Sequence, residues 1–354
     1  MTSLKKKVAF TYNLKLSDRI EEAEFDSRST VEAIVGAIGC LGYQIEPIEV
    51  SGLVSQVISK LEVFKPDLVF NTAEGKEGRF REAFYPSLFE QLQIPYAGSD
   101  PYSCLLTLDK ALTKQVLKAR GVLTPRWLSV ASAEDLKDCD LSFPLIVKPN
   151  FEGSSKGIQS DSVVEDRAEL EARVLDRLDQ FPDGLLVEEY ISGKDIIVPF
   201  LEGASPATLG ILPPYQYLFD EKLIGHRKFE IYDYELKNDL SDAVSVQMAD
   251  RFSASETDKI QRLASHISKT LRIRDFGRID FRLSSTGELY FIEINALPSL
   301  EPESGIFQAA KSVGLPNYSS VFDCIINSAR KRTKASSCQH SLSRAAYSQP
   351  ASQI

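Results

Sequence analysis

The sequence has few of the residues that usually build zinc or disulfide sites. Its 354 residues include five cysteines and three histidines, without a Cys-x-x-Cys spacing and with the histidines far apart. An odd number of scattered cysteines is typical of reduced thiols and gives no zinc signature. We therefore expect a cytoplasmic protein in which oxygen atoms hold any bound metal.

The chain also lacks a long hydrophobic run and an excess of basic charge. No stretch approaches the roughly 18 apolar residues of a membrane span, and the start MTSLKKKVAF has no apolar segment typical of a secretory signal. A net charge of −9 and a pI of about 5.1 argue against nucleic-acid binding, which needs a basic face. We expect neither a membrane nor a nucleic-acid partner, and 43% hydrophobic residues suit two or three globular domains.

The first hundred residues alternate between strand and helix patterns. Strands are predicted at 5–13, 43–50 and 66–74, each followed by a helix. Ser29 with Glu32 resembles a capping box at the start of the first of these helices. The alternation favours a parallel sheet covered by helices, an α/β domain over residues 1–100.

The rest of the chain divides into two further domains and a tail. One helix is predicted between Tyr102 and Gly121, and then strands and a charged helix complete a domain over 101–200. Residues 201–330 combine loops, two helices and a hairpin, so this half is expected to be α+β. The Ser-rich residues 331–354 lack apolar periodicity and are interpreted as a disordered tail.

LIVKPNFEGSSKGIQ (145–159) joins an apolar strand that ends in Lys148 to a Gly/Ser-rich loop. Gly153 and Gly157 let backbone amides approach a ligand, and two hydroxyls and Lys156 add donors and charge. This combination suits a polyphosphate, although it matches neither GxxxxGK[ST] nor GxGxxG. The alternative is an ordinary hairpin turn with a solvated lysine.

LLVEEYISGKDIIV (185–198) places acidic residues between apolar runs. Glu188 and Asp195 need partners there, because an unpaired buried carboxylate is costly. An adenine amine and ribose hydroxyls would be such partners, and a salt bridge at the sheet edge is the alternative.

FGRIDFRLSSTGELYFIEINALPSL (276–300) reads as two strands joined by a tight turn. Alternation by two predicts that four polar residues share one face, namely Arg278, Asp280, Glu293 and Asn295. The expected turn sets Arg278 opposite Glu293 and Asp280 opposite Phe291. Two carboxylates and an amide oxygen suit Mg²⁺ carried by substrate phosphates, and the arginine could stabilise a transferring phosphoryl group. A simple Arg278–Glu293 ion pair is the alternative.

These motifs occur in the order typical of ATP-grasp enzymes. Asp109-Lys110, Lys148-Pro149 with EGSSxG, EEYISGxD and GRIDF…FIEIN resemble that superfamily, and within it the D-alanine–D-alanine ligases over about residues 65–325. IPYAGSDP (94–101) resembles that family's junction between its first two domains. The resemblance implies three domains, with the nucleotide held between two sheets.

The resemblance also implies residues that bind ATP. They are Lys110, Lys148, Ser154, Ser155, Glu188, Tyr190, Ile191 and Asp195. The lysines would contact phosphates, and the serines belong to a loop that closes over them. Glu188 would meet the adenine amine and Asp195 the ribose.

A second implied set serves catalysis and the metal. Arg278, Lys237 and Ser154 would act on the transferred phosphoryl group. The implied ligands of two Mg²⁺ ions, with Mn²⁺ as a substitute, are Asp280, Glu293 and Asn295. Ser304 would bind the carboxylate of the second substrate. The family also implies a homodimer.

The loops that orient the substrates depart from the family pattern. The family's first Gly-Gly loop is replaced by residues 10–29, and its His-Gly…Gly-Glu-Asp-Gly loop by FNTAEGKEGRFREA (70–83). Pro298-Ser299 stands where the family has Pro-Gly. The first-domain residues predicted to contact an unusual substrate are Glu74, Arg79 and Arg81, with solvated loop charges as the alternative.

Three functions fit these residues. The first is an ATP- and Mg²⁺-dependent carboxylate–amine ligase of the D-alanine–D-alanine ligase type, joining an amino acid to an acceptor through an acyl phosphate. The second is a ligase of secondary metabolism, such as one condensing amino acids with mycosporine-glycine. The third is a non-catalytic ATP-binding protein, which would not need Arg278 together with the whole metal set. A nicotinamide-linked oxidoreductase is disfavoured, because GxGxxG is absent.

Overall fold

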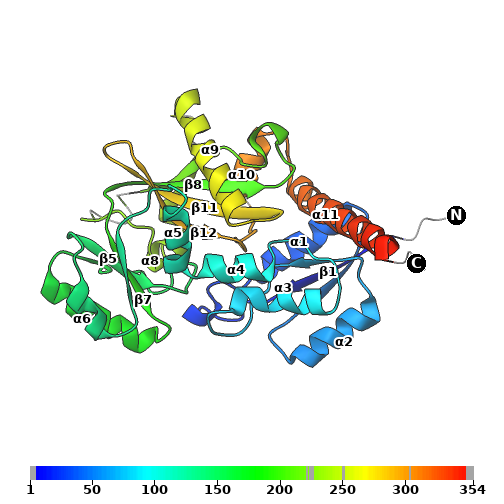
Figure 1. Ribbon diagram of the computed structural model, residues 1–354, viewed down its shortest axis with the longest axis horizontal. Coiled ribbons are helices and arrows are strands. Elements are labelled where there is room, and N and C mark those ends of the chain that lie inside the picture. Colours follow the sequence, from blue (N-terminus) through cyan, green and yellow to red (C-terminus); the bar gives the residue numbers. More distant parts are fainter. Residues whose placement is uncertain (1–4, 221, 223–226, 249–251, 303, 348–354) are drawn as a thin grey trace, which may run out of the picture.

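Three sheets, formed by successive parts of the chain, make up the protein (Figure 1). The computed structural model describes residues 5–220, 222, 227–248, 252–302 and 304–347. The first sheet is parallel and the other two are antiparallel. An α/β N-terminal part and an α+β remainder are therefore confirmed.

The N-terminal part has a three-stranded sheet in the order β2-β1-β3. Its elements are β1 (Lys7–Tyr12), η1 (Ile20–Glu22), α1 (Arg28–Cys40), β2 (Gln44–Glu49), α2 (Val54–Phe64), β3 (Leu68–Asn71) and α3 (Arg81–Gln91). The predicted cap of α1 is wrong by two residues. Ser27 is still extended, and its hydroxyl accepts the Thr30 amide at 3.1 Å, so Ser29 already lies inside the helix.

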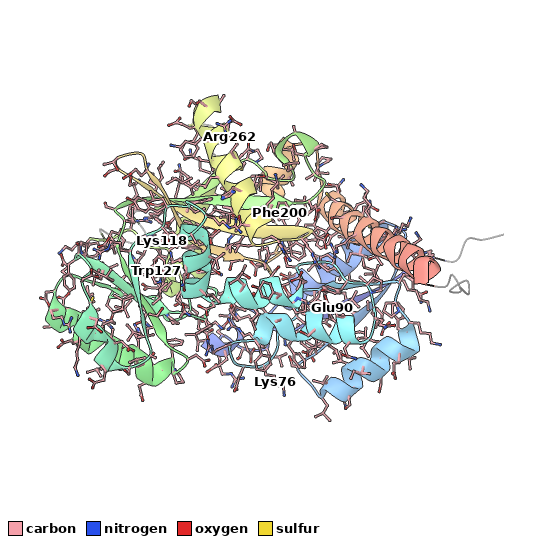
Figure 2. The ribbon with its side chains drawn as sticks, in the orientation of Figure 1. Lys76, Glu90, Lys118, Trp127, Phe200 and Arg262 are labelled. Atoms are coloured by element: carbon pink, nitrogen blue, oxygen red, sulfur yellow. The ribbon has the colours of Figure 1, made fainter. Side chains whose placement is uncertain are left out.

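The central part has a four-stranded sheet in the order β4-β7-β5-β6. Its elements are α4 (Pro101–Leu108), α5 (Lys110–Lys118), β4 (Trp127–Val130), η2 (Ala133–Asp138), β5 (Leu145–Pro149), β6 (Val163–Val164), α6 (Arg167–Gln180) and β7 (Leu185–Glu189). The single helix predicted between Tyr102 and Gly121 is two helices, because Asp109 turns to an extended conformation and caps α5. Lys118 of α5 lies 5.3 Å from the Trp127 ring centroid, which joins this helix to β4 (Figure 2).

The C-terminal part has a five-stranded sheet in the order β10-β9-β8-β11-β12. Its elements are β8 (Gly193–Leu201), η3 (Pro206–Thr208), β9 (Tyr215–Phe219), α8 (Tyr234–Asn238), η4 (Ser241–Ala243), β10 (Val244–Met248), α9 (Ala254–Thr270), β11 (Phe276–Ser284), β12 (Leu289–Asn295), α10 (Gly305–Ser312) and α11 (Tyr318–Tyr347).

The β11–β12 hairpin has a different register from the predicted one. Asp280 lies opposite Glu293 and Arg278 opposite Asn295, because the turn pairs Leu283 with Leu289 and a bulge follows Asp280. The turn and the bulge each shift the pairing by one residue. Beyond the bulge the total shift of two leaves Arg278, Asp280, Glu293 and Asn295 on one face, as predicted.

The predicted disorder from residue 331 onward is wrong as far as Tyr347. Helix α11 continues through this segment and runs beside α1 (Figure 1). Arg332 binds Asp275 at 2.6 Å and the Tyr96 carbonyl at 2.9 Å, contacts that apolar periodicity does not reveal. Residues 348–354 of the predicted tail lie outside the described residues.

The N-terminal sheet shares one hydrophobic core with the C-terminal part. Phe10 and Phe70 of the first sheet are buried in the same cluster as Phe276 and Phe322. The central sheet has its own cluster, which includes Val147 and Val187. The boundaries at 100, 200 and 330 stay a prediction. None of the helices in the described ranges combines the length and hydrophobicity of a membrane span.

Candidate active site

A cavity of about 420 Å³ lies between the four-stranded and five-stranded sheets. The predicted residues on its wall are Glu74, Lys148, Ser154, Ser155, Glu188, Tyr190, Ile191, Asp195, Lys237, Arg278, Asp280, Glu293, Asn295 and Ser304. Residues of the two antiparallel sheets thus meet residues of the N-terminal part that lie outside its strands, such as Glu74. Lys110 stands behind this wall, with its Nζ 3.4 Å from Glu293.

The four polar residues of the β11–β12 hairpin converge on one side of the cavity. The Arg278 guanidinium donates to both Asp280 oxygens, at 2.9 Å from Nε and 2.8 Å from Nη2. Asn295 donates to the same carboxylate at 3.4 Å. The Arg278–Glu293 ion pair, considered as the alternative to a metal site, is not formed, and Arg278 pairs with Asp280, because the register places Asn295 opposite the arginine.

These residues fit a divalent metal ion that enters with substrate phosphates. Burial opposes ionisation of Glu293, but Lys110, Lys148 and Arg278 lower its pKa to about 2, so it is a carboxylate at neutral pH. Burial raises the pKa of Asp280, and Arg278 counteracts that rise. Two carboxylates and one amide oxygen are hard ligands, and they leave coordination positions for phosphate and water. Within the described residues, no group of three or more acidic, histidine or cysteine side chains forms a separate metal site.

Glu188 lies on the cavity wall between two lysines. It is 1% exposed, and it pairs with Lys148 and, at 2.7 Å, with Lys114. Burial opposes its ionisation, yet the two cations hold its pKa below the ordinary value. Burial also lowers the pKa of Lys114 to about 8. Lys114 was not predicted, although it follows Lys110 by one helical turn on α5.

Arg282 organises the segment predicted to hold adenine and ribose. It donates to the Ile191 carbonyl at 2.9 Å, to the Tyr190 hydroxyl at 2.9 Å and to Asp195 at 2.7 Å. Strand pairing places Arg282 directly opposite Asp195. The sequence prediction missed this residue, although alternation puts it on the face of Arg278.

The Gly/Ser-rich loop 152–157, the predicted lid, lines the cavity and is bonded to the segment around α8. Lys237 donates to the Ser154 hydroxyl at 3.0 Å, and the Ser155 hydroxyl donates to the Tyr232 carbonyl at 2.9 Å. Ser154 and Ser155 have positive φ angles of 52° and 57°, which bend the loop over the opening. Burial and the nearby charge of Arg278 lower the pKa of Lys237.

A buried charge cluster joins the lid to the N-terminal part. Arg81 contacts Glu74 at 2.9 Å and Glu24 at 3.2 Å, and Lys156 of the lid contacts Glu24 at 2.5 Å. Burial opposes ionisation of Glu24, but Arg81 and Lys156 lower its pKa to about 2. Lys156 therefore neutralises protein carboxylates and is not free to contribute its charge to a polyphosphate.

Two of the three predicted first-domain contacts lie off the cavity wall. Arg79 is exposed and stacks 4.5 Å from the Phe151 ring, and Arg81 is enclosed among carboxylates. Only Glu74 reaches the cavity. The sequence indicated these residues by their charge, but their partners belong to other segments of the chain.

The end of the cavity beyond Arg278 has residues that the sequence prediction missed. They are Asp26, Thr72, Tyr215, Tyr217, Tyr232 and Glu301. Ser304, which was predicted, lies there too, and its hydroxyl oxygen is buried without a hydrogen-bond partner among the described residues.

The sequence model for "D-ala D-ala ligase C-terminus" matches residues 116–327, which include most of the residues on the cavity wall. The chain belongs to the D-alanine–D-alanine ligase family. It is therefore an ATP-dependent ligase that forms carbon–nitrogen bonds between small molecules on the ATP-grasp fold, in a family that uses a divalent metal ion.

Relatives match over most of the chain. A D-alanine–D-alanine ligase of Aquifex aeolicus is 32% identical over 301 residues, 85% of this chain and 94% of the relative. An uncharacterised protein, y4sG, of Sinorhizobium fredii is 31% identical over 288 residues, covering 78% of this chain and 81% of that protein.

Solved structures have the same fold. The D-alanine–D-alanine ligase of Bacillus anthracis complexed with ATP has a TM-score of 0.72 at 22% identity, over 94% of this chain and 99% of the other. The VanG D-Ala:D-Ser ligase of Enterococcus faecalis has a TM-score of 0.69 at 21% identity, over 92% and 99%.

Proposed function

We propose that this ligase uses Mg²⁺-ATP to activate a carboxylate as an acyl phosphate and then joins it to an amine. A carboxylate oxygen attacks the γ-phosphorus and ADP leaves. The amine nitrogen then attacks the carbonyl carbon, the bond from that carbon to the phosphate oxygen breaks, and phosphate leaves with the amide formed. The nitrogen gives up its proton in this step.

The main support for this proposal is the arrangement of Arg278 and the carboxylates around it. Phosphoryl transfer needs positioning and charge neutralisation more than covalent help from the protein. Asp280, Glu293 and Asn295 would hold Mg²⁺, which would supply positive charge against the phosphates. Arg278, fixed by both Asp280 oxygens, is held ready to stabilise the charge on the transferred group.

The remaining residues bind ATP and exclude water. Lys148 and Lys110 approach the phosphates from the central part, with Glu188 at the adenine and Asp195 at the ribose. Ser154 and Ser155 close the lid, and Lys237 holds it from α8. A closed lid protects an acyl phosphate from hydrolysis.

The charge cluster around Arg81 favours substrates other than two D-alanines. Glu24 and Glu74 are neutralised by Arg81 and Lys156, so these first-domain charges are largely used within the protein. A ligase of secondary metabolism, including one that acts on mycosporine-glycine, is therefore the second candidate. The homodimer and the cytoplasmic location belong to the same proposal by family resemblance.

The deciding assay supplies ATP and Mg²⁺ with amino acids, singly and in pairs, and with mycosporine-glycine plus each amino acid. Phosphate release and product mass are measured. Turnover of D-alanine alone identifies a cell-wall type ligase, and turnover of another pair identifies a recruited one. ATP binding with no turnover of any pair would overturn the ligase proposal in favour of a non-catalytic protein.

Arg278→Gln tests the phosphoryl-transfer role directly. We expect kcat to fall about 10²- to 10³-fold, because one preformed donor to the developing charge is lost. Arg262→Gln is the matched control, since Arg262 is an exposed residue of α9 paired only with Asp258 among the described residues (Figure 2). Equal kcat values for the two variants would contradict the assigned role.

A further inference from the structure

Acidic and basic side chains both line the cavity wall. Asp26 and Glu301 belong to the end beyond Arg278, and Glu74 lies on the same wall. Arg81 neutralises Glu74 at 2.9 Å. In the described part of the chain, neither Asp26 nor Glu301 has an ion-pair partner.

Asp26 is built into the wall as a buried carboxyl group. It is 9% exposed, and its side chain accepts a hydrogen bond from the Thr72 hydroxyl at 2.5 Å. Burial raises its pKa to about 7, and the charge of nearby Glu301 adds to this rise. A cation placed between the two carboxylates would be stabilised by both.

Ser304 gives independent evidence that a ligand occupies this end. Its hydroxyl oxygen is buried without a hydrogen-bond partner among the described residues, which is costly unless a ligand supplies one. Ser304, Asp26 and Glu301 line the same cavity, and the Ser304 amide donates to the Glu301 carbonyl at 3.2 Å.

Three tyrosines form the adjoining wall. The Tyr217 ring lies 5.7 Å from Tyr215 and 4.4 Å from Tyr232. Gly305 admits the Tyr215 ring, because a Cβ there would lie 2.1 Å from a ring carbon. Aromatic faces beside carboxylates are a common setting for the recognition of ammonium and guanidinium groups.

We propose that Asp26 and Glu301, beside this tyrosine wall, bind a cationic group of the amine substrate. The reacting amine must be unprotonated to attack, so the bound cation is a second nitrogen of the same molecule. The substrate class is therefore an amino acid with a basic side chain. This inference rests on the proposed ligase function.

Lysine and norleucine provide the test, because they differ only in the terminal ammonium group. Each enantiomer is titrated by calorimetry into the full-length protein with Mg²⁺ and a non-hydrolysable ATP analogue. We expect lysine to bind about tenfold or more tightly than norleucine, the difference typical of one charge-assisted contact. Equal binding, or tighter binding of norleucine, would overturn the proposal.

Variants of the two carboxylates test which residues cause the preference for lysine over norleucine. Asp26→Asn should abolish the preference for lysine, and Glu301→Gln should reduce it. If Asp26→Asn does not fold, the result for Glu301→Gln decides whether the carboxylates bind the cation. Glu62→Gln is the control and should keep the full preference, because Glu62 is an exposed acid of α2 outside the cavity. An undiminished preference for lysine in the folded Asp26→Asn or Glu301→Gln protein would show that the carboxylates do not bind the cation.

ADP release separates this inference from the ligase proposal. If norleucine supports ADP release and lysine does not, the ligase function is supported and the proposed binding of a cation by Asp26 and Glu301 is wrong. If lysine binds with the expected preference but no amino-acid pair releases ADP, the binding of the cation is supported and the ligase function is wrong.

Discussion

Glu24 is held by cations from two distant segments, Arg81 of α3 and Lys156 of the lid. No local pattern marks such a residue, because its role depends on partners that only the folded chain brings together. The β11 residues Arg278 and Asp280 were predictable for the opposite reason. Strand alternation is a local property, and a shift of two residues preserved the predicted face.

Glu24→Gln should weaken the acid dependence of stability. The folded-state pKa of about 2 lies below the ordinary value near 4.5, so the unfolded chain binds more protons between these values. The carboxylate therefore contributes stability that is complete above pH 4.5 and is lost as the pH falls toward 2. We expect the drop in unfolding free energy from pH 7 to 3.5 to be smaller by about 1 kcal/mol in the variant.

Urea unfolding at the two pH values measures this difference. Glu21→Gln is the matched control, because Glu21 is exposed in the same segment of the chain. The same pH dependence in Glu24→Gln and wild-type protein would show that Arg81 and Lys156 do not stabilise the charged form of Glu24.

At the scale of elements, the sequence indicated most helices and strands but missed where they break. Asp109 divides the predicted single helix into α4 and α5, because its carboxylate accepts the Leu112 amide at 3.0 Å and starts a second helix. Apolar periodicity continues across this break and therefore does not reveal it. The break begins α5 at Lys110, beside Glu293.

Gly305→Ala should destabilise the start of α10. The added Cβ would overlap the Tyr215 ring, and overpacking of this kind costs about 1–3 kcal/mol. Gly36→Ala is the control and should change the stability in the opposite direction. Gly36 is exposed inside α1, and no atom lies within 4 Å of an added Cβ. It should stabilise the protein by about 0.5–1 kcal/mol. Thermal unfolding compares both variants, and a stabilised Gly305→Ala would contradict the packing described.

At the scale of the whole molecule, the sequence predicted most strands and helices of the three sheets. It did not predict that the N-terminal and C-terminal parts share one core. The first sheet and the C-terminal helices contribute to one buried cluster, and such packing between distant segments leaves no local signal. The end of the chain shows the same limitation. Residues from 331 onward lack apolar periodicity, yet Arg332 anchors α11 through polar contacts.

Arg332→Met should destabilise the whole protein. Asp275 is fully buried and also accepts the Gly98 amide at 2.8 Å, so losing its cation leaves a buried charge poorly compensated. We expect the free energy of unfolding in urea to fall by about 3 kcal/mol. Lys331→Met changes an exposed neighbour and should have little effect. Equal stabilities for the two variants would show that the Asp275 contact does not hold α11.

The shared core determines which part of the enzyme moves. Because the first sheet and the C-terminal helices are buried against each other, they behave as one frame, while the central sheet has a separate core and carries the lid (Figure 1). We expect the central sheet, and not α4 and α5, to move as a hinge when substrates enter and products leave, because α4 and α5 are buried with the C-terminal strands. Turnover is limited by how often that hinge opens whenever the chemistry is faster.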